Sequence, residues 1–420
     1  MAEGYTNKAW ENIFNTHHQL DKDISSNGLA YISAEEIKKF GNREPRLMCK
    51  FDSRESRPSI FKQKNLSILP IQNGKYILIE GDGYQNLSVS SSNINYLSPP
   101  KGIWYETLPL IPRSESQVID LAFATGLLED FLEDPSLRLT IRGRLRSKPF
   151  DFYFNSQTQK LTADGVQVEI DAGYEGNKIY LIEAKMGEIQ DFNIRQLYYP
   201  LRMWFEEDIS KDVIPILINY ANNIISISQY EFEDFWIYST IKLVKCTRYA
   251  FEEQPVKLIL NEIIDKITIS DQEPFDIPFP QADDLTKVRD TVDLISWGYN
   301  SKKSIADFWQ VDQRQADYYA NAAMYLGFIK RNGSCWQLTN KGNTFVNLPT
   351  TRRNDLLCSS IFSYPVFFSV GKFYLQNKIL PHGEILNTIL EKYLPLSVET
   401  IKRRSQTVLS WLNYILKLCD

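Results

Sequence analysis

The sequence has little of two residues on which many catalytic and metal sites depend. Only three histidines occur among 420 residues, His17, His18 and His382, so histidine-based metal sites and histidine general bases have little material. The five cysteines are scattered without a closely spaced pair, which argues against a zinc site and against a disulfide framework. Carboxylates are therefore the favoured metal ligands.

Long apolar runs are also missing. No run reaches the roughly 18 residues that a membrane span requires, and the first residues lack the basic region and apolar core of a secretory signal. We therefore expect no membrane association and an intracellular, reducing compartment. A hydrophobic content of 43% argues against extended disorder, and the length suits two to four domains.

The charge is unevenly distributed. The net charge of −5 is unusual for a DNA-binding protein. From residue 286 to the end, however, 17 Lys and Arg face 10 Asp and Glu, a surplus of +7, whereas the rest of the chain carries −12. A basic C-terminal third is what contact with phosphate requires, although a modest surplus is common.

Two apolar runs, 168–171 and 179–185, indicate a β-hairpin whose Gly-containing loop, 172–177, is longer than two residues. Pairing of these strands would bring Asp171 beside Glu183, and the period of two puts Glu183 and Lys185 on one face. The pattern alone arises often by chance. Its apolar context strengthens it, because an unpaired acid at the end of a buried strand is costly. Mg²⁺ prefers such oxygen ligands.

The hairpin lies in a mixed-sheet α/β domain predicted at residues 111–250. We expect a helix of about 20 residues from Ser114, a strand at 138–146, and a helix at 190–206 interrupted by Pro200. Four arginines share one face of that strand, and such a face needs phosphate, carboxylates or water as partners: Arg138, Arg142, Arg144 and Arg146.

A separate α/β domain is predicted before it, at residues 1–110. Its charged segment around Lys50-Phe51-Asp52-Ser53-Arg54 contacts DNA or is simply a solvated loop, and the solvated interpretation is favoured. A linker at 251–285, rich in Pro and acid around 271–284, follows the α/β domain and resists regular structure.

Residues 286–348 have the signals of a winged helix: two helices, then a hairpin with an Asn-Gly turn. The more polar side of the second helix carries the residues that a recognition helix would present to DNA, Arg314, Gln315, Tyr318 and Asn321. Winged helices also bind proteins, so that alternative stays open.

A second helical, winged-helix-like domain is predicted at residues 349–420. Its last helix begins with a Ser397 cap and carries Arg403 and Arg404 early, where they could meet a DNA backbone. A solvated basic face explains the same residues almost as well.

These residues together resemble a known family. Glu169-Ile170-Asp171, the 11-residue spacer, Glu183-Ala184-Lys185 and the following Gln196-Leu197-Tyr198-Tyr199-Pro200 resemble the PD-(D/E)xK nuclease superfamily, and the whole layout is similar to its type II restriction endonucleases. The resemblance implies an α/β (mixed) restriction-endonuclease-like core. Ile170 stands where the family name has proline, at a position that supplies no ligand.

The resemblance also implies residue roles. Asp171 and Glu183, with the carbonyl of Ala184, would hold Mg²⁺, and Lys185 would position or help to deprotonate the attacking water. Either Glu169 or Glu115 would complete the site, and Gln196 would contact a metal-bound water or DNA, or only pack its helix. Arg142 and Arg144 would contact DNA.

The sequence thus predicts a Mg²⁺-dependent type II restriction endonuclease that cuts specific sites in double-stranded DNA. A homodimer suits a palindromic site. A prokaryotic, cytoplasmic setting and a cognate DNA methyltransferase follow from the resemblance. Two alternatives remain: a methyl-directed or repair DNA nuclease, and a non-catalytic winged-helix DNA-binding regulator whose hairpin acids are structural.

Overall fold

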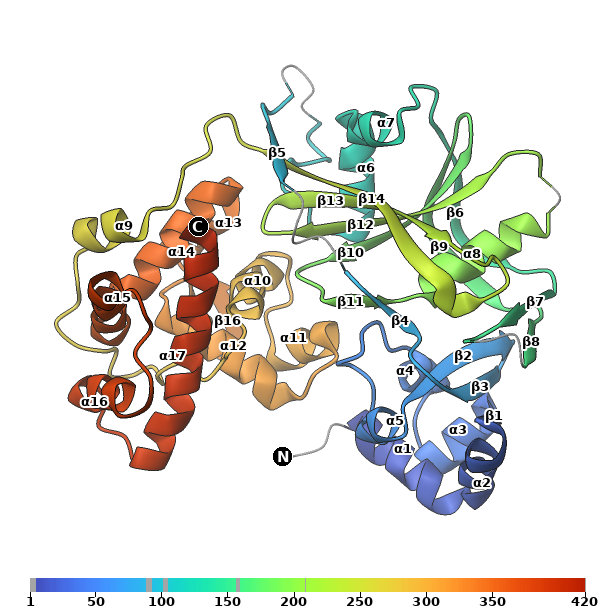
Figure 1. The fold of residues 1–420 in the computed structure, drawn as a ribbon, viewed down its shortest axis with the longest axis horizontal. Coiled ribbons are helices and arrows are strands. Elements are labelled where there is room, and N and C mark those ends of the chain that lie inside the picture. The colour runs from blue at the N-terminus through green and yellow to red at the C-terminus, as the bar shows by residue number, and fades with distance from the viewer. Residues whose placement is uncertain (1–4, 88–92, 101–104, 156–158, 208, 420) are drawn as a thin grey trace. The chain divides into compact units, whose positions relative to one another are not determined.

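The computed structural model describes residues 5–87, 93–100, 105–155, 159–207 and 209–419. Its contacts divide the chain into two compact units, of which the first comprises Met1–Asn95, Pro100–Tyr220 and Ile225–Tyr249 and the second comprises Tyr96–Pro99, Ala221–Ile224 and Ala250–Asp420. The architecture is mixed α/β, with a large mixed sheet and a helical C-terminal region (Figure 1). This confirms the predicted coarse fold class.

The first unit and its sheets contain these elements: α1 (Tyr5–Thr16), α2 (His18–Asn27), β1 (Leu29–Ser33), α3 (Ala34–Gly41), α4 (Pro45–Cys49), α5 (Ser59–Gln63), β2 (Leu66–Gln72), β3 (Lys75–Glu80), β4 (Tyr84–Asn86), β5 (Ile94–Leu97), α6 (Glu115–Ala124), α7 (Leu127–Leu132), β6 (Arg138–Arg146), β7 (Phe150–Tyr153), β8 (Lys160–Ala163), β9 (Gln167–Glu175), β10 (Ile179–Met186), β11 (Asp191–Asn193), α8 (Arg195–Phe205), β12 (Val213–Ala221), β13 (Ile224–Phe232), η1 (Tyr238–Thr240) and β14 (Ile241–Phe251).

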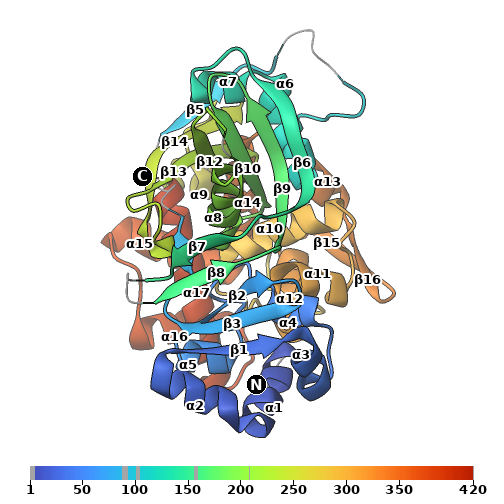
Figure 2. The ribbon, with the colours of Figure 1, turned by 90° about the vertical axis from the view of Figure 1, so that its right-hand side faces the viewer.

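The N-terminal residues build a three-stranded antiparallel sheet in the order β1-β3-β2. Figure 2 shows helices α1, α2 and α3 on the side of this sheet away from β7 and β8. A capping box of Ser33 and Glu36 fixes the start of α3. Leu29 and Ile77 of the small sheet belong to the same hydrophobic cluster as Phe152, so this segment packs as part of the first unit.

The large sheet has the order β5-β14-β13-β12-β10-β9-β6. Strand β10 is antiparallel to β9 and parallel to β12, and α8 lies between β10 and β12 in the chain. Parallel neighbours need such a crossover connection. The β9–β10 hairpin and the start of α8 are consequently close together, which positions the candidate site.

The hairpin differs from its prediction. The predicted loop 172–177 was wrong in extent, because β9 continues to Glu175 and β10 begins at Ile179. Tyr174 is buried, and a Cβ at Gly173 would fall 2.7 Å from the Cβ of Ile141. Close strand packing there requires glycine. Asp171 therefore lies inside its strand rather than at the end.

Two helix predictions also need correction. The single helix expected from Ser114 is two helices, because Gly126 adopts a left-handed φ of 76° between α6 and α7. The helix expected at 190–206 starts only at Arg195, after the short strand β11. It also runs through Pro200, whose burial in the core offsets the single missing backbone donor.

The second unit contains α9 (Leu260–Lys266), α10 (Leu285–Ser296), α11 (Lys302–Trp309), α12 (Gln313–Tyr325), β15 (Ile329–Asn332), β16 (Cys335–Leu338), α13 (Asn340–Asn347), α14 (Thr350–Phe362), α15 (Pro365–Asn377), α16 (Gly383–Tyr393) and α17 (Val398–Cys419).

Helices α10, α11 and α12 followed by the β15–β16 hairpin have the element order of a winged helix. Side-chain caps at Asp284, Ser301 and Asp312 start the three helices. The predicted Asn-Gly turn is displaced by one residue: Asn332 pairs with Cys335, so Gly333 and Ser334 are the central residues.

Residues 349–419 form helices α14 to α17 and contain no strand, so this region resembles a winged helix in its helices alone. One hydrophobic cluster joins it to the winged helix and to α9, which lies inside the predicted linker. Residues 271–284 contain no helix or strand, as their composition predicts. Across the described chain, no single helix is long and apolar enough to cross a membrane; α14 and α15 meet that test only as a pair, bent by 105°.

Candidate active site

Glu183 and Lys185 form a largely buried ion pair on β10. The Nζ atom of Lys185 lies 2.6 Å from Oε1 of Glu183, and their side chains are 14% and 11% exposed. They share one face of the strand, as the period of two predicts, while Ala184 between them is fully buried. Burying two charges is costly unless further polar groups satisfy them.

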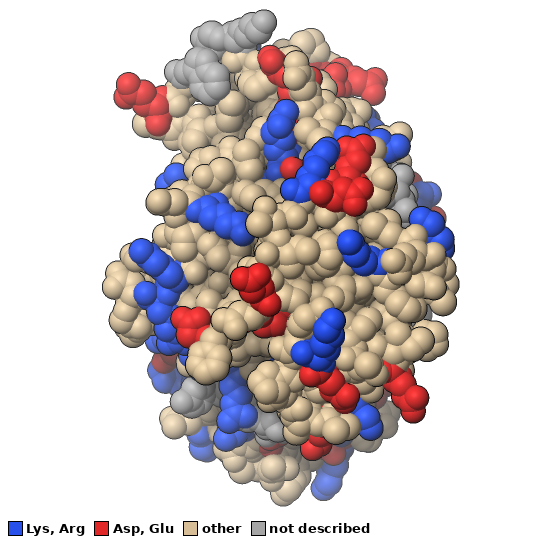
Figure 3. All heavy atoms as spheres, turned by 90° about the vertical axis from the view of Figure 1, so that its left-hand side faces the viewer, with Lys and Arg blue, Asp and Glu red and all other residues tan. Residues whose placement is uncertain are grey.

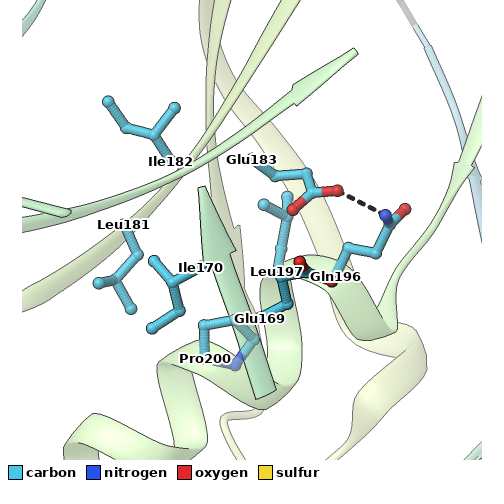
Figure 4. Close-up of a pocket in the computed structure, with 8 residues that line it drawn as sticks. All are labelled: Glu169, Ile170, Leu181, Ile182, Glu183, Gln196, Leu197 and Pro200. Atoms are coloured by element: carbon cyan, nitrogen blue, oxygen red, sulfur yellow. Dashed lines mark hydrogen bonds between the residues drawn. The ribbon is translucent and has the colours of Figure 1, made fainter. Parts of the chain in front are cut away.

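One such group and a further carboxylate lie beside the pair. Gln196, near the start of α8, donates from Nε2 to Oε1 of Glu183 at 2.5 Å (Figure 4). Within the described part of the chain, Oε1 of Gln196 is buried and accepts no hydrogen bond. Across the hairpin, Oδ2 of Asp171 accepts from the Ala184 N–H at 2.9 Å. The structure thus brings together Asp171, Glu183 and Lys185, as the sequence predicts.

Glu115 also reaches this cluster. It is the first residue of α6, directly after the Ser114 cap. The pKa of Glu115 is raised, mainly by burial. The Lys185 ammonium lowers this pKa and the Asp171 carboxylate raises it. These electrostatic effects place Glu115 near the hairpin acids.

Glu169 lies at the rim. It is exposed on β9, and its Oε1 accepts from Nε of Arg144 at 3.2 Å, across from it on β6. It lines a small depression together with Glu183 and Gln196 (Figure 4). Of the two candidates for the additional acid, Glu115 is the more buried one.

The protonation states follow from burial and from neighbouring charges. Burial is the largest influence on Glu183 and raises its pKa to about 7, opposed by Lys185 and reinforced by Asp171 and Glu115. Burial lowers the pKa of Lys185, but the carboxylates of Glu183, Asp52 and Glu115 outweigh it and the net shift is upward. Lys185 is therefore a charged ammonium at neutral pH.

Asp52 is a member of the site that the sequence did not predict. Its charge raises the pKa of both Lys185 and Glu115, although it belongs to the N-terminal segment 50–54. The sequence around Asp52 predicted a loop that contacts DNA or is solvated, and gave it no place in the metal site. No spacing along the chain relates it to Lys185, so only the tertiary fold reveals it.

The charge of the cluster suits a divalent cation. When ionised, its four carboxylates and two ammonium groups sum to −2: Asp52, Glu115, Asp171, Glu183, Lys50 and Lys185. Among the described residues, no three His, Cys, Asp or Glu side chains are arranged to hold a metal by themselves. Mg²⁺ needs only one or two carboxylates, because it keeps several waters. Asp171, Glu183 and the Ala184 carbonyl therefore fit this cation.

The predicted arginine face lies next to these acids. Arg142 and Arg144 project from the edge strand β6 and are exposed. Arg142 forms an ion pair at 2.8 Å with Asp120 of α6, and Arg144 pairs with Glu169. Carboxylates thus satisfy part of the arginine face, and exposure leaves both guanidinium groups accessible.

The DNA-contact residues predicted in the second unit are partly exposed. Arg314 and Gln315 are exposed at the start of α12, while Tyr318 and Asn321 are half-buried. On α17, Arg403 is exposed and Arg404 is half-buried.

Arg404 and Tyr318 come close enough for Tyr318 to affect the pKa of Arg404, which burial lowers. Residues from two predicted domains therefore meet in one unit.

The face of the molecule that is drawn in Figure 3 shows scattered charges of both signs with no large basic patch.

Comparisons with known proteins name no activity. Three family models, each described as a domain of unknown function, match residues 7–78 (DUF6996), 79–250 (DUF6997) and 287–420 (DUF7226). No curated protein and no solved structure matches the chain.

The raised pKa of Glu183 predicts a pH-dependent stability. Its ordinary value of 4.5 applies to the unfolded chain, so the folded protein binds the extra proton between pH 4.5 and about 7 and loses stability as pH rises through that window. Relative to that of the Glu183→Gln variant, the free energy of unfolding of the metal-free wild type should fall by about 2 kcal/mol between about pH 5.5 and pH 8. Urea unfolding in EDTA at both pH values measures this. A constant difference between the two proteins would contradict the assigned protonation.

Proposed function

We propose that this protein is a Mg²⁺-dependent endonuclease that hydrolyses phosphodiester bonds at specific sites in double-stranded DNA, as a type II restriction endonuclease does. The observation that carries the proposal is the cluster around the buried Glu183–Lys185 pair. Asp171 and Glu115 act on this pair from β9 and α6. A structural ion pair has no need of additional acids, which add to the effect of burial in raising the pKa of Glu183.

The proposal includes a restriction-endonuclease-like core built around the cluster. Helix α6 precedes the β6, β9 and β10 strands, and α8 then crosses over to β12, parallel to β10. In this proposed core, acids from the β9–β10 hairpin and from α6 come together beside α8. Gln196 of α8 meets Glu183 in this way.

Each residue has a role in the proposed reaction. Asp171, Glu183 and the Ala184 carbonyl would hold Mg²⁺, which when bound polarises a phosphoryl oxygen and lowers the pKa of its water. The Lys185 ammonium would orient the attacking water and stabilise the negative charge that develops on the phosphate. Glu115 would accept a hydrogen bond from that water. As the water oxygen forms the new P–O bond, the water would give a proton to the Glu115 carboxylate; the bond to the leaving oxygen breaks, and that oxygen keeps the electron pair and takes up a proton from solvent.

DNA contact is assigned to three sets of residues. Arg142 and Arg144, exposed on the edge strand beside the acids, would bind phosphates near the scissile bond. The exposed start of α12 would read bases through Arg314, Gln315, Tyr318 and Asn321, and α17 would contact the backbone through Arg403 and Arg404. A homodimer would cut both strands of a palindromic site, and a separate cognate methyltransferase would protect host DNA, both within a prokaryotic cytoplasm.

Digestion of unmethylated phage DNA tests this function. Purified protein with Mg²⁺ should give discrete fragments whose sequenced ends share one site, and EDTA should stop cutting. Discrete cutting of methylated DNA alone would favour a methyl-directed nuclease, and a smear would favour a repair or non-specific one. DNA binding without cutting, for every divalent metal and methylation state, would favour the non-catalytic regulator and defeat the enzyme proposal.

A further inference from the structure

Segment 50–54, which follows α4, carries charged residues next to the candidate active site. Lys50 and Asp52 lie with Nζ and Oδ2 3.6 Å apart. The charge of Asp52 acts on Lys185 and Glu115, and the charge of Lys50 acts on Glu115. Two side chains of one short segment are therefore within electrostatic reach of the cluster.

The segment is held firmly on both sides of Asp52. The carbonyl of buried Phe51 accepts hydrogen bonds from the Tyr84 hydroxyl at 3.0 Å and from Nδ2 of Asn193 at 3.1 Å. The Arg54 N–H donates to Oδ1 of Asp191 at 2.8 Å. The Arg54 guanidinium contacts four further groups: Asp82 at 2.8 Å, the Asn86 side chain at 2.5 Å, the Tyr84 carbonyl at 2.7 Å and Oδ2 of Asp191 at 3.4 Å.

These contacts tie the segment to the helix that bears Gln196. Asn193 donates to Phe51 through Nδ2, and its Oδ1 accepts from the Arg195 N–H at 3.1 Å, at the start of α8. The next residue, Gln196, donates to Glu183. One short stretch of chain therefore fixes both the segment that carries Asp52 and the amide that contacts Glu183.

The proposed reaction requires a second carboxylate near Lys185. Oε1 of Glu183 lies 2.6 Å from the Lys185 ammonium. A Glu183 carboxylate that holds a divalent cation can no longer serve this ammonium fully, and a buried charge without a partner is strongly unfavourable. Another carboxylate must then keep Lys185 in place.

We propose that Asp52 is a positioning residue of this site: its carboxylate holds the Lys185 ammonium there when Glu183 binds a divalent cation. The inference rests on the proposed function and adds the N-terminal segment to the catalytic machinery. Asp52 acts through Lys185 and need not touch the substrate. Its anchored segment keeps it in place without a metal.

The Asp52→Asn variant tests the proposal in the full-length protein with Mg²⁺. The kcat for DNA cleavage should fall roughly 10–100-fold, the usual effect of removing an outer-shell partner. The KM for DNA should change less than about threefold, because uniform substrate binding is retained. Asp52→Glu should restore part of kcat. Glu55→Gln, the same neutralisation in an exposed residue of the neighbouring chain, is the matched control and should cut like the wild type.

A second readout does not depend on cleavage. With Ca²⁺ present as the cation and no DNA, acetic anhydride labelling of Lys185, quantified by mass spectrometry, should be several-fold faster in Asp52→Asn than in the wild type. Without a cation the difference between the two proteins should be much smaller, because Glu183 still holds the ammonium. Equal labelling with Ca²⁺ would overturn the proposal.

The outcomes separate this proposal from the function on which it rests. Wild-type protein that cuts DNA, with an Asp52→Asn variant of unchanged kcat, would overturn the role of Asp52 alone. A raised KM with unchanged kcat would make Asp52 a substrate contact instead. If the wild type cuts no DNA with any divalent cation, the nuclease function itself fails. Arg54→Ala, which releases the segment while keeping Asp52, should reproduce the kcat loss.

Discussion

Replacement of Asp171 by asparagine is expected to lower the rate of Mg²⁺-dependent DNA cleavage by about 10³-fold, as loss of a charge-stabilising group in an active site does. The substitution removes one negative charge that faces the proposed cation. It keeps the shape of the side chain and an oxygen that can accept from the Ala184 N–H. Initial rates of plasmid cleavage, measured at equal protein folding, give the result.

Lys185→Ala should cause a loss of similar size, because it removes the ammonium that is proposed to stabilise the developing phosphate charge. Both variants should still bind DNA in a gel-shift assay with Ca²⁺, since the predicted base and backbone contacts lie elsewhere. Lys178→Ala is the matched control, because Lys178 is an exposed lysine just before the same strand and pairs with Asp212 at 3.2 Å. Cutting by Asp171→Asn at the wild-type rate would show that the hairpin acid holds no catalytic cation.

The largest expected effect on stability comes from Arg353→Ala in the second unit. Arg353 is fully buried on α14, and its guanidinium forms an ion pair with Asp293 at 2.5 Å. It also donates to Oδ1 of Asn223 at 3.3 Å and lies 4.3 Å from the centroid of the Phe345 ring. Removal of Arg353 leaves the buried Asp293 carboxylate without its hydrogen-bonded ion-pair partner, which costs about 3–5 kcal/mol. Thermal or urea unfolding should show this loss.

Two further variants define the cause of that loss. The neighbouring Arg352 is exposed, so Arg352→Ala should change stability by less than about 0.5 kcal/mol. The double variant Arg353→Met with Asp293→Leu removes both charges and should recover much of the loss, because a well-packed apolar pair replaces a buried ion pair at little cost. An Arg353→Ala protein as stable as the wild type would mean that water or another group satisfies Asp293.

The sequence predicted the features that depend on near neighbours in the chain. An apolar run predicts strand β10, and the period of two places Glu183 and Lys185 on one face of it. Caps such as Ser301 and Asp312 mark the starts of α11 and α12. Each of these signals acts within a few residues, so each can be read locally.

The errors occur where packing decides between local options. Residues 172–175 include the small residues Ala172 and Gly173, which favour a loop. They nevertheless extend β9, because Ile141 on the adjacent strand packs directly onto Gly173. Pro200 signals a helix break, yet α8 continues because its apolar face is buried. Local conformational preferences of about 1–3 kcal/mol are outweighed by the free energy gained when these side chains are buried.

Sequence patterns were sufficient to identify the hairpin acids and the lysine two residues after Glu183 in the candidate site, and the element order of a winged helix in the second unit. The other groups that join the hairpin acids are brought there by the fold. Asp52 is held at the cluster by Phe51 and Arg54, and Glu115 is brought there by α6. The pKa of Glu183 depends on the same packing, because burial and charge are properties of positions in space rather than of positions along the chain.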